Sequence, residues 1–167
     1  MALDGSTVVG SCLNTPLTRD DVFSYDETAS NLYEDKAMFH IELLCKLVHK
    51  ELDLFTKLNV NQMFEIGWLS VEPSYGGKGL ATRLVRNSLE LGAQNNFEFA
   101  KVDCTGPASA AASKKAGMQE VIKLSYDDYK IDGNIVFKKT PNRASHLTVL
   151  VCRLQNSHPY VLPTIQS

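Results

Sequence analysis

A glycine-rich loop between an apolar segment and a helical pattern is the part of this sequence best suited to chemistry. Residues 64–71 are apolar and aromatic enough for a buried strand, and an amphipathic helical spacing follows the loop. Gly76, Gly77 and Gly79 would let a ligand approach the main chain without a Cβ in the way. The free N–H groups and the dipole of a helix N-terminus attract anions, and Lys78 adds a mobile cation. These features indicate a loop that binds a phosphate.

Two known phosphate-binding loops do not fit the sequence. A Walker A loop requires Ser or Thr after its Lys, whereas Lys78 is followed by Gly79. A dinucleotide fingerprint requires G-x-G-x-x-G near the first strand of a βαβ unit, which is not the setting here. A tight turn without a ligand explains the glycines equally well, so the spacing alone leaves both interpretations open.

The order of apolar segments predicts an α/β protein with a mixed sheet and helices on the faces of that sheet. Thr105 is expected to cap a short helix, with Pro107 in its first turn and Gly117 at its end. In chain order, we expect a hairpin around residues 4–6 with its second arm at 7–13, a surface loop at 14–35, an amphipathic helix at 36–58 that Asp35 would cap, a strand at 64–71, a helix at 79–94, a strand at 97–104, the short helix at 105–116, strands at 121–129 and 135–138 around an Asp132-Gly133 turn, and a last strand at 146–154.

The composition describes one globular domain, which we place at residues 1–154, followed by a loose tail at 155–167. The 167 residues are 44% hydrophobic and 22% charged, which is ordinary for a folded domain. A formal net charge of −2 argues against a protein dedicated to binding nucleic acid. No apolar run approaches the roughly 18 residues of a membrane span, so we expect no membrane partner.

The cysteines and histidines do not have the spacing of a metal site. Cys12, Cys45, Cys104 and Cys152 are scattered and form no C-x-x-C pair. This pattern favours free thiols in a reducing cytosol over disulfides or a metal cluster. We therefore expect a cytoplasmic protein without a metal ion.

The loop and its flanks resemble motif A of the GNAT acetyltransferase superfamily, R/Q-x-x-G-x-G/A, with Gly79 and Ala81 at the last two positions. The run SVEPSYGGKGLATRL is similar to the form V-x-P-x-Y-R-G-x-G-I/L-A/G-x-x-L. The resemblance implies the GNAT acyl-CoA N-acyltransferase fold and a site for acetyl-CoA. Gly76 stands where the motif has Arg or Gln, so a side chain that usually braces the loop is absent. The residues implied in binding acetyl-CoA are Gly76, Gly77, Lys78, Gly79, Leu80, Ala81 and Thr82 at the pyrophosphate, and Leu69, Ser70 and Val71 along the pantetheine, where the next strand splays away.

A closer resemblance is to the insect arylalkylamine (dopamine-type) N-acetyltransferases. Their signature C-S-S-x-x-S-A-x-x-x-x-K-x-G-F corresponds to C-T-G-P-A-S-A from Cys104 and K-A-G-M from Lys115. A second signature, D-Y-K-x-x-G-x-x-V-F-K, begins here at Asp128. Family members have a strand and a helical segment ahead of the hairpin, which supply a catalytic Glu and part of the amine pocket. Because Met1 stands just before the Asp-Gly turn, we expect that this segment is lacking, that the sheet edge is exposed and that the chain self-associates through it.

Acetyl transfer from a thioester to an amine needs a base, donors for the oxyanion and stabilisation of the departing thiolate. Backbone N–H groups near residues 69–71 are the natural oxyanion donors. Glu65 is the candidate base: it is the one carboxylate in the buried strand, and its apolar neighbours would favour that role. It also lies eleven positions before Gly76, where the histone-acetyltransferase branch of the superfamily carries its base. A Glu that faces solvent on a half-exposed strand is an equally ordinary interpretation.

Thr105 and Ser109 match the two serines that the arylalkylamine family is thought to use with its Glu. At a spacing of four they share one helix face, and Ser109 could donate to the leaving sulfur. Thr105 could equally be only a helix cap. Ser113 stands where many GNAT enzymes have a Tyr general acid, so beside the cofactor it could act only through a hydrogen bond. Asp128 and Tyr129 fit either the acceptor side of the site or the core.

We therefore expect a cytosolic N-acetyltransferase that uses acetyl-CoA and acts on a small arylalkylamine such as dopamine, tryptamine or serotonin. One alternative is a CoA-binding protein with weak catalytic activity. Another is a GNAT enzyme that acts on polyamines or on lysine side chains. The mild acidity of the chain suits any cationic acceptor and does not choose among them.

Overall fold

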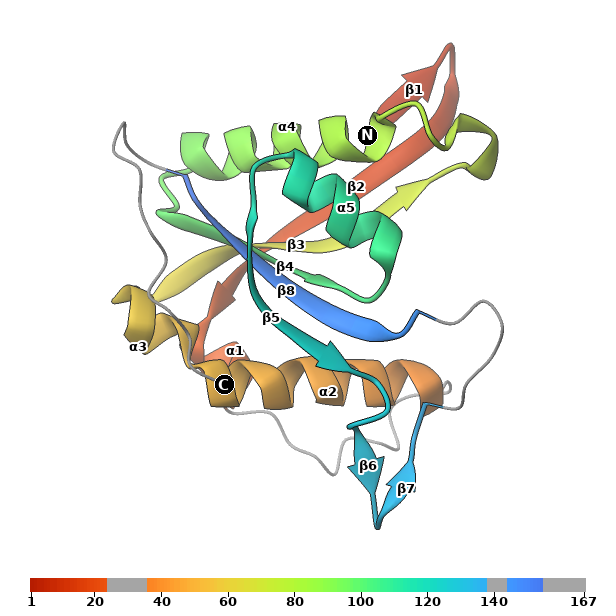
Figure 1. The fold of residues 1–167 in the computed structure, drawn as a ribbon. Coiled ribbons are helices and arrows are strands. Elements are labelled where there is room, and N and C mark those ends of the chain that lie inside the picture. The colour runs from red at the N-terminus through yellow and green to blue at the C-terminus, as the bar shows by residue number, and fades with distance from the viewer. Residues whose placement is uncertain (24–35, 138–143, 155–167) are drawn as a thin grey trace.

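A single six-stranded sheet forms the centre of the molecule. The computed structural model describes residues 1–23, 36–137 and 144–154. The strand order is β1-β2-β3-β4-β8-β5; β3 and β4 are parallel and the other neighbours are antiparallel (Figure 1). This arrangement confirms the predicted mixed α/β sheet. The strands are β1 (Ala2–Asp4), β2 (Thr7–Thr18), β3 (Gln62–Val71), β4 (Phe99–Cys104), β5 (Gln119–Ser125) and β8 (His146–Arg153).

Helices cover both faces of the sheet (Figure 1). One face carries α1 (Arg19–Phe23), α2 (Lys36–Leu52) and α3 (Leu54–Leu58). The other face carries α4 (Leu80–Gln94) and α5 (Pro107–Lys115). The 3-10 helix η2 (Pro73–Tyr75) precedes the glycine loop, and β6 (Lys130–Ile131) pairs with β7 (Asn134–Ile135) in a small separate hairpin.

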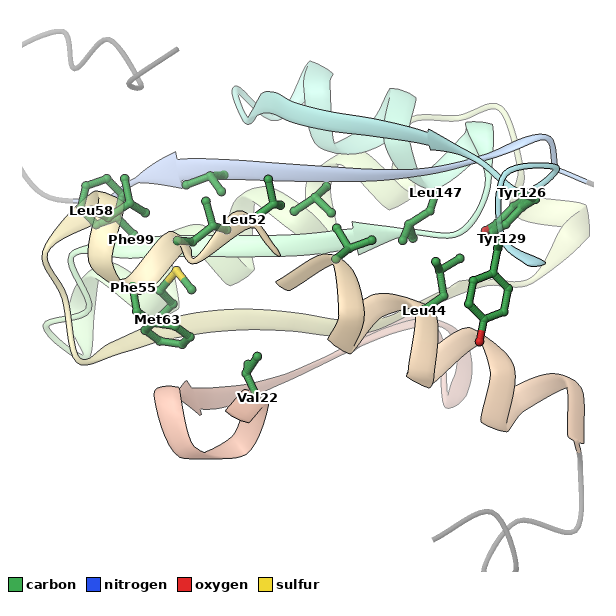
Figure 2. Packing of buried hydrophobic residues seen from close by; sticks show 14 residues of the cluster. Val22, Leu44, Leu52, Phe55, Leu58, Met63, Phe99, Tyr126, Tyr129 and Leu147 are labelled. Atoms are coloured by element: carbon green, nitrogen blue, oxygen red, sulfur yellow. The ribbon is translucent and has the colours of Figure 1, made fainter. Parts of the chain in front are cut away.

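The alternation of side chains along the strands divides the core into two clusters. On the α2 side, Phe99 and Met63 pack with Leu44, Leu52 and residues of β8 (Figure 2). On the α4 side, another cluster is formed by Phe64, Ile66, Val85, Ala100, Val102, Cys104, Met118 and Leu150 among others. Odd-numbered residues of β4 therefore face α2, and even-numbered residues face α4. This places Lys101 on the α2 side, next to Phe99.

The parallel strands β3 and β4 separate after a short contact. Their register joins only Phe64–Ala100, Glu65–Lys101 and Ile66–Val102. Beyond Ile66, β3 continues to Val71 with β2 as its partner. Gly67 is an extra residue on β3, because Leu13 pairs with Trp68 and the next residue, Asn14, pairs with Ile66. A bulge of this kind bends the strand, and here it opens the gap between β3 and β4 that the family resemblance implied.

The prediction of a surface loop at residues 14–35 was wrong for the first part of this range. β2 continues to Thr18, and α1 then forms a short turn of helix from Arg19. Leu17 packs against the core on the α2 side, which gives the end of the strand an apolar anchor. Pro16, which suggested a loop, is tolerated because β2 has an open outer edge at this position. Residues 24–35 lie outside the described residues.

The single helix expected at residues 36–58 is two helices. Asp53 has a left-handed φ of 36°, which ends α2 after Leu52. Its carboxylate accepts a hydrogen bond from the Thr56 N–H at 3.3 Å and so caps α3. The apolar spacing continues through this break, so periodicity could not reveal it. The predicted cap Asp35 lies outside the described residues.

The second half of the chain follows the prediction with shifted boundaries. Gly106 caps α5 in place of Thr105, with Pro107 as the first helical residue. Gly117 has a φ of 105° and ends the helix as predicted. The strand expected to reach residue 129 ends at Ser125, and the predicted Asp132-Gly133 turn joins the short β6 and β7. Strands expected at 97–104 and 146–154 are β4 and β8, while Lys138 and the predicted tail at 155–167 lie outside the described residues.

Candidate active site

The glycine loop has the backbone geometry of an open anion cradle. Gly77 and Gly79 have φ values of 73° and 76°, in the left-handed region that favours glycine. No atom lies within 4 Å of where a Cβ would stand at either position, so the loop has room for a ligand. Gly79 is the N-cap of α4, a helix of 15 residues. The N–H groups of Leu80, Ala81 and Thr82 belong to its first turn, where no intrahelical acceptor exists. Together they present donors to an anion.

The loop is braced by contacts other than the missing Arg or Gln of the motif. The Gly76 N–H donates to the Pro73 carbonyl at 3.0 Å, and a Cβ at Gly76 would lie 3.0 Å from that same oxygen. The Tyr75 hydroxyl donates to Asp4, which ties η2 to the β1–β2 hairpin; this hydrogen bond raises the pKa of Tyr75. Lys78 is exposed and lies 5.0 Å from the centre of the Tyr75 ring.

The end of β3 presents backbone donors to the gap between β3 and β4. The Glu72 N–H donates to the Val9 carbonyl on β2 at 2.9 Å. Because N–H groups alternate in direction along a strand, those of Leu69 and Val71 point away from β2. The N–H of Ser70 points toward β2. Leu69 and Val71 are thus the members of the predicted 69–71 segment whose N–H groups are directed into the gap.

A cavity of about 680 Å³ lies beside this gap, on the α2 side of the sheet. Its walls come from β2, β3, β4, α1, α2 and the start of α5. The three predicted catalytic residues, Glu65, Thr105 and Ser109, all line it. Residues 40 positions apart in the sequence are therefore brought to one site by the parallel pairing of β3 with β4.

Glu65 faces the cavity, and its neighbours are charged, contrary to the expected apolar setting. Its side chain is 22% exposed, and its Oε1 lies 2.6 Å from the Lys101 Nζ. Phe64 and Ile66 do not surround it, because alternation directs them to the α4 side of the sheet. Glu65 is not a freely solvated side chain either, because the parallel register sets it beside Lys101, with which it forms an ion pair.

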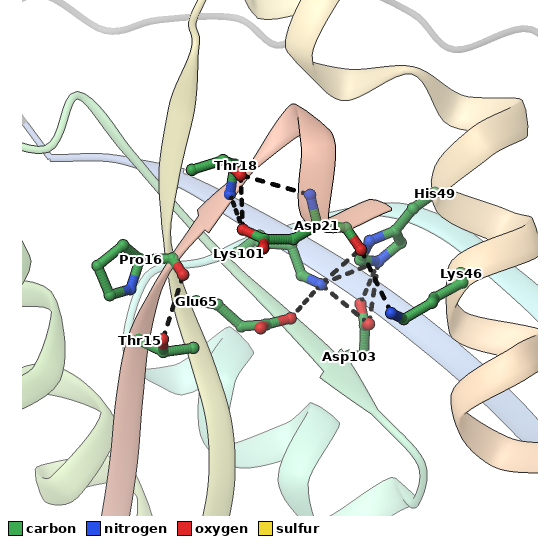
Figure 3. A network of polar contacts seen from close by, with 9 residues as sticks. All are labelled: Thr15, Pro16, Thr18, Asp21, Lys46, His49, Glu65, Lys101 and Asp103. Carbon is green, nitrogen blue, oxygen red and sulfur yellow. Dashed lines mark hydrogen bonds and ion pairs between the residues drawn. The ribbon is translucent and has the colours of Figure 1, made fainter. Parts of the chain in front are cut away.

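Lys101 is the centre of a buried ionic network (Figure 3). Its Nζ lies 3.0 Å from Asp103 Oδ2 and 2.9 Å from His49 Nε2, and His49 Nε2 lies 2.9 Å from Asp103 Oδ2. Burial lowers the pKa of Lys101, but Asp103 and Glu65 outweigh it and the pKa lies above its ordinary value. Burial likewise raises the pKa of Asp103, but Lys101 and His49 hold it well below the usual range. Both groups are charged at neutral pH.

Sequence reasoning missed Lys101, Asp103 and His49. A signal for two of them existed, since Lys101 and Asp103 are opposite charges two residues apart on an otherwise apolar strand. Such residues share one face of the strand, and buried charges are normally paired. His49 gave no such signal, because it reaches the network from α2 and only the packing of that helix on the sheet brings it there.

The two predicted hydroxyl residues take different positions. The Ser109 Oγ donates to the Gly106 carbonyl at 3.0 Å, in the first turn of α5. Thr105 precedes the helix and is exposed, so the two do not share a helix face, although both line the cavity. Ser113 is fully buried, with its Oγ 3.8 Å from the Cys104 Sγ, and it does not line the cavity. The predicted place of Ser113 beside the cofactor is therefore not the one observed.

Asp128 and Tyr129 do not line the cavity. Tyr129 packs in the cluster on the α2 side of the sheet, and Asp128 is exposed. Among residues 1–23, 36–137 and 144–154, no three His, Cys, Asp or Glu side chains are grouped so that they could hold a metal ion. Within the same ranges, every helix is too short or too polar to cross a membrane.

Comparison with known proteins identifies this architecture. Residues 48–118 match the model of the acetyltransferase (GNAT) family. This part of the chain thus matches a GNAT acetyltransferase domain, and the solved structures similar to the chain include insect arylalkylamine N-acetyltransferases. Arylalkylamine N-acetyltransferase 2 from Aedes aegypti is 27% identical, with a TM-score of 0.77 over 88% of this chain and 68% of that one.

Two further solved structures share the fold at lower identity. The mosquito arylalkylamine N-acetyltransferase like 5b is 21% identical, with a TM-score of 0.75 over 87% of this chain and 68% of that one. The Drosophila melanogaster polyamine N-acetyltransferase, an enzyme that forms N-acetylagmatine, is 21% identical, with a TM-score of 0.77 over 90% and 72%. The neighbours therefore include enzymes for two different classes of amine.

Proposed function

We propose that this protein transfers the acetyl group of acetyl-CoA to the primary amine of a small arylalkylamine. The observation that carries the proposal is the convergence of Glu65, Ser109 and Leu69 on one cavity. That cavity lies beside the gap between β3 and β4.

The donor would be held at the loop and along β3. The N–H groups of Leu80, Ala81 and Thr82, with the open backbone of Gly77 and Gly79, suit a pyrophosphate. Lys78 would add a screened positive charge. Ser70, whose N–H and carbonyl both point toward β2, would present neither group to the pantetheine. Acetyl-CoA supplies the activated thioester, and the chain supplies its position.

The acceptor would enter the cavity on the α2 side. Four carboxylates line it: Asp21, Glu42, Glu65 and Asp103. Among the described residues, Lys46 is a cation on the lining and the buried Lys101 contacts two of the carboxylates, so negative charge is still in excess. An excess of negative charge attracts a protonated amine. The apolar lining includes Trp68, Met38 and Ile41, and the Trp68 side chain is 59% exposed. A half-exposed indole offers a face on which an aromatic ring can stack.

The chemistry follows from these positions. Glu65 accepts a proton from the substrate ammonium, and the freed amine nitrogen attacks the thioester carbonyl carbon. The oxygen that becomes negative is stabilised by the N–H of Leu69 or Val71. The C–S bond then breaks, and the departing thiolate receives a hydrogen bond from Ser109, whose hydroxyl turns to it from the Gly106 carbonyl. The second proton of the nitrogen passes through water to the thiolate, and Glu65 releases its proton to solvent. The products are the N-acetylated amine and CoA.

A second acceptor class, polyamines such as agmatine, is favoured by the same acidic lining. A second positive charge would be attracted by Asp21 or Glu42, whose carboxylates lie on the lining away from β3. The apolar residues around Trp68 favour the arylalkylamine, because a polyamine chain gains little from an aromatic wall. Lysine side chains of proteins and a merely CoA-binding role are the remaining alternatives.

The test combines binding and turnover. Acetyl-CoA binding is measured by isothermal titration, and CoA release is then followed with tryptamine, dopamine, agmatine and spermidine. Trp68 is the only tryptophan of the chain, so an amine that enters the cavity should change its fluorescence. Higher kcat/KM for tryptamine and dopamine supports the proposal. Higher kcat/KM for agmatine or spermidine would select the polyamine class, and binding without CoA release would select the CoA-binding role.

Self-association is a further part of the proposal. β1 pairs only with residues 7–10 of β2, and within the described ranges no strand pairs with the outer edge of residues 11–18. Leu13 on this edge is 61% exposed, and an open strand edge can pair with a second copy. We expect sedimentation velocity to show dimers that Leu13→Lys abolishes. Leu91→Lys, at an exposed Leu of α4, is the control and should leave the dimer intact. A monomeric wild-type protein at every concentration would contradict this part.

A further inference from the structure

We propose that Lys101 is a positioning residue for the acetyl transfer, acting through Glu65. Its ammonium binds Oε1 of Glu65 and so turns the other carboxylate oxygen, Oε2, toward the amine. This inference rests on the proposed function, since it assigns the group that makes Glu65 an effective base.

The contact between the two side chains is built into the sheet. Glu65 and Lys101 are register partners on parallel strands, and their charged atoms lie 2.6 Å apart. This contact occurs at the second of the three residue pairs that join β3 to β4, next to the point where the strands separate. Within the described residues, Oε2 of Glu65 has no hydrogen-bond partner. One oxygen is therefore engaged and the other is available on the cavity side.

Lys101 is itself held from behind. Its side chain has no exposed surface, and Asp103 and His49 contact its Nζ at 3.0 Å and 2.9 Å. Asp103 belongs to the same strand, and His49 comes from α2 (Figure 3). Asp103 and His49 fix the ammonium from two elements, so the direction from which it meets Glu65 is fixed as well. A catalytic group works best when a packed partner holds its geometry.

The arrangement is a costly one if it serves stability alone. Buried ion pairs gain little over apolar side chains of similar volume, because both charges lose their hydration. An apolar residue at position 101 would continue the cluster that Phe99 forms on this side of the sheet. Among the partners of Lys101, Glu65 is the one proposed to act as the base, and its side chain lines the cavity and is only partly buried. This is the observation that directs the inference to function.

The test is a double-mutant cycle between Lys101→Met and Glu65→Gln, with kcat, KM for tryptamine and the acetyl-CoA Kd measured for each variant. We expect Lys101→Met to lower kcat about 10- to 100-fold, by analogy with the loss of side chains that orient metal ligands, with an unchanged acetyl-CoA Kd. If Lys101 acts through Glu65, the double variant will be no slower than Glu65→Gln alone. If the fold-decreases in kcat of the two single variants multiply in the double variant, Lys101 acts independently of Glu65 and the inference is overturned.

A second substitution covers the case in which Lys101→Met does not fold. Lys101→Arg keeps a cation between Asp103 and Glu65 but moves it, so kcat should fall in the wild-type background and not in Glu65→Gln. Lys114→Met is the matched control, because its ion pair with Glu120 has the same length of 2.6 Å but lies on the surface. Its kcat should be that of the wild type.

The outcomes separate this inference from the proposed function. Acetyl transfer that falls in Glu65→Gln but not in Lys101→Met or Lys101→Arg would overturn the role of Lys101 and leave the function standing. Transfer that is unchanged in Glu65→Gln would overturn the role of Glu65, and that of Lys101 with it. A protein that transfers acetyl to none of the amines would overturn both proposals.

Discussion

At the scale of single residues, the surroundings of Glu65 decide how this site can work. A carboxylate in an apolar pocket and a carboxylate beside a fixed ammonium are two different kinds of base. The first gains basicity from poor solvation, and the second depends on orientation. The 2.6 Å contact with Lys101 places Glu65 in the second class. Its contribution to catalysis should then depend strongly on the geometry of the side chain.

Replacing Glu65 with Gln should lower kcat on the order of 10²- to 10⁴-fold, the range expected when a general base is lost. Acetyl-CoA affinity should stay nearly constant, because Glu65 lies outside the glycine loop. Both quantities come from CoA release and isothermal titration. Glu120→Gln is the control, since Glu120 pairs with Lys114 at the surface, away from the cavity. A decrease in kcat below threefold would return Glu65 to an ordinary structural position.

The sequence could predict Glu65 but not its partners. Glu65 stands out as a lone carboxylate in an apolar strand, and its distance from the loop pointed to the same role. Lys101 becomes its neighbour only through the strand register, which depends on packing across 36 residues of chain. The buried state of Ser113 was missed for a similar reason, because the small residues of α5 give no clear apolar face.

At the scale of elements, the loop before α4 and the bulge in β3 create the site. The glycine pattern was enough to predict the loop, since closely spaced glycines are disfavoured inside a strand or a helix. The Gly67 bulge could not be read from the sequence, because one glycine in a strand does not specify its pairing. The break at Asp53 was hidden as well, since apolar spacing runs through it.

Gly79→Val should abolish acetyl-CoA binding by isothermal titration. Valine at a φ of 76° is strained by roughly 1–2 kcal/mol, and its side chain would fill the open space over the loop. Gly133→Val is a matched control, because Gly133 has a φ of 77°, is equally open, and lies in the β6–β7 turn. The free energy of unfolding measured in urea should fall by a similar amount in both variants, while only Gly79→Val should lose affinity for acetyl-CoA. Equal affinity for acetyl-CoA in the two variants would show that the glycine loop is not part of the binding site.

At the scale of the whole molecule, a charged network lies within the apolar packing on one side of the sheet. Lys101 and Asp103 lie on the same strand face as Phe99, and His49 lies on the helix that covers this face. The mixed sheet and its helix order followed from sequence patterning, because apolar periodicity reflects the burial of each element. The network did not, since it joins α2 to the centre of the sheet through side chains whose partners are set by tertiary packing. Its charges should make folding depend on pH.

Asp103 provides the test of this dependence. Its folded-state pKa lies below the unfolded value of about 3.9, so its stabilisation is complete above that pH and is lost as the pH falls toward the folded-state pKa. Asp103→Asn should lower the free energy of unfolding by about 3 kcal/mol at pH 7, because it leaves part of the Lys101 charge unpaired in the interior. The difference from the wild type should shrink as urea denaturation is repeated at pH 5, 4 and 3. Glu120→Gln, at the exposed Lys114 pair, should cost under about 1 kcal/mol. A loss in Asp103→Asn that is the same at every pH would mean that packing of the side chain, rather than its charge, holds α2 to the sheet.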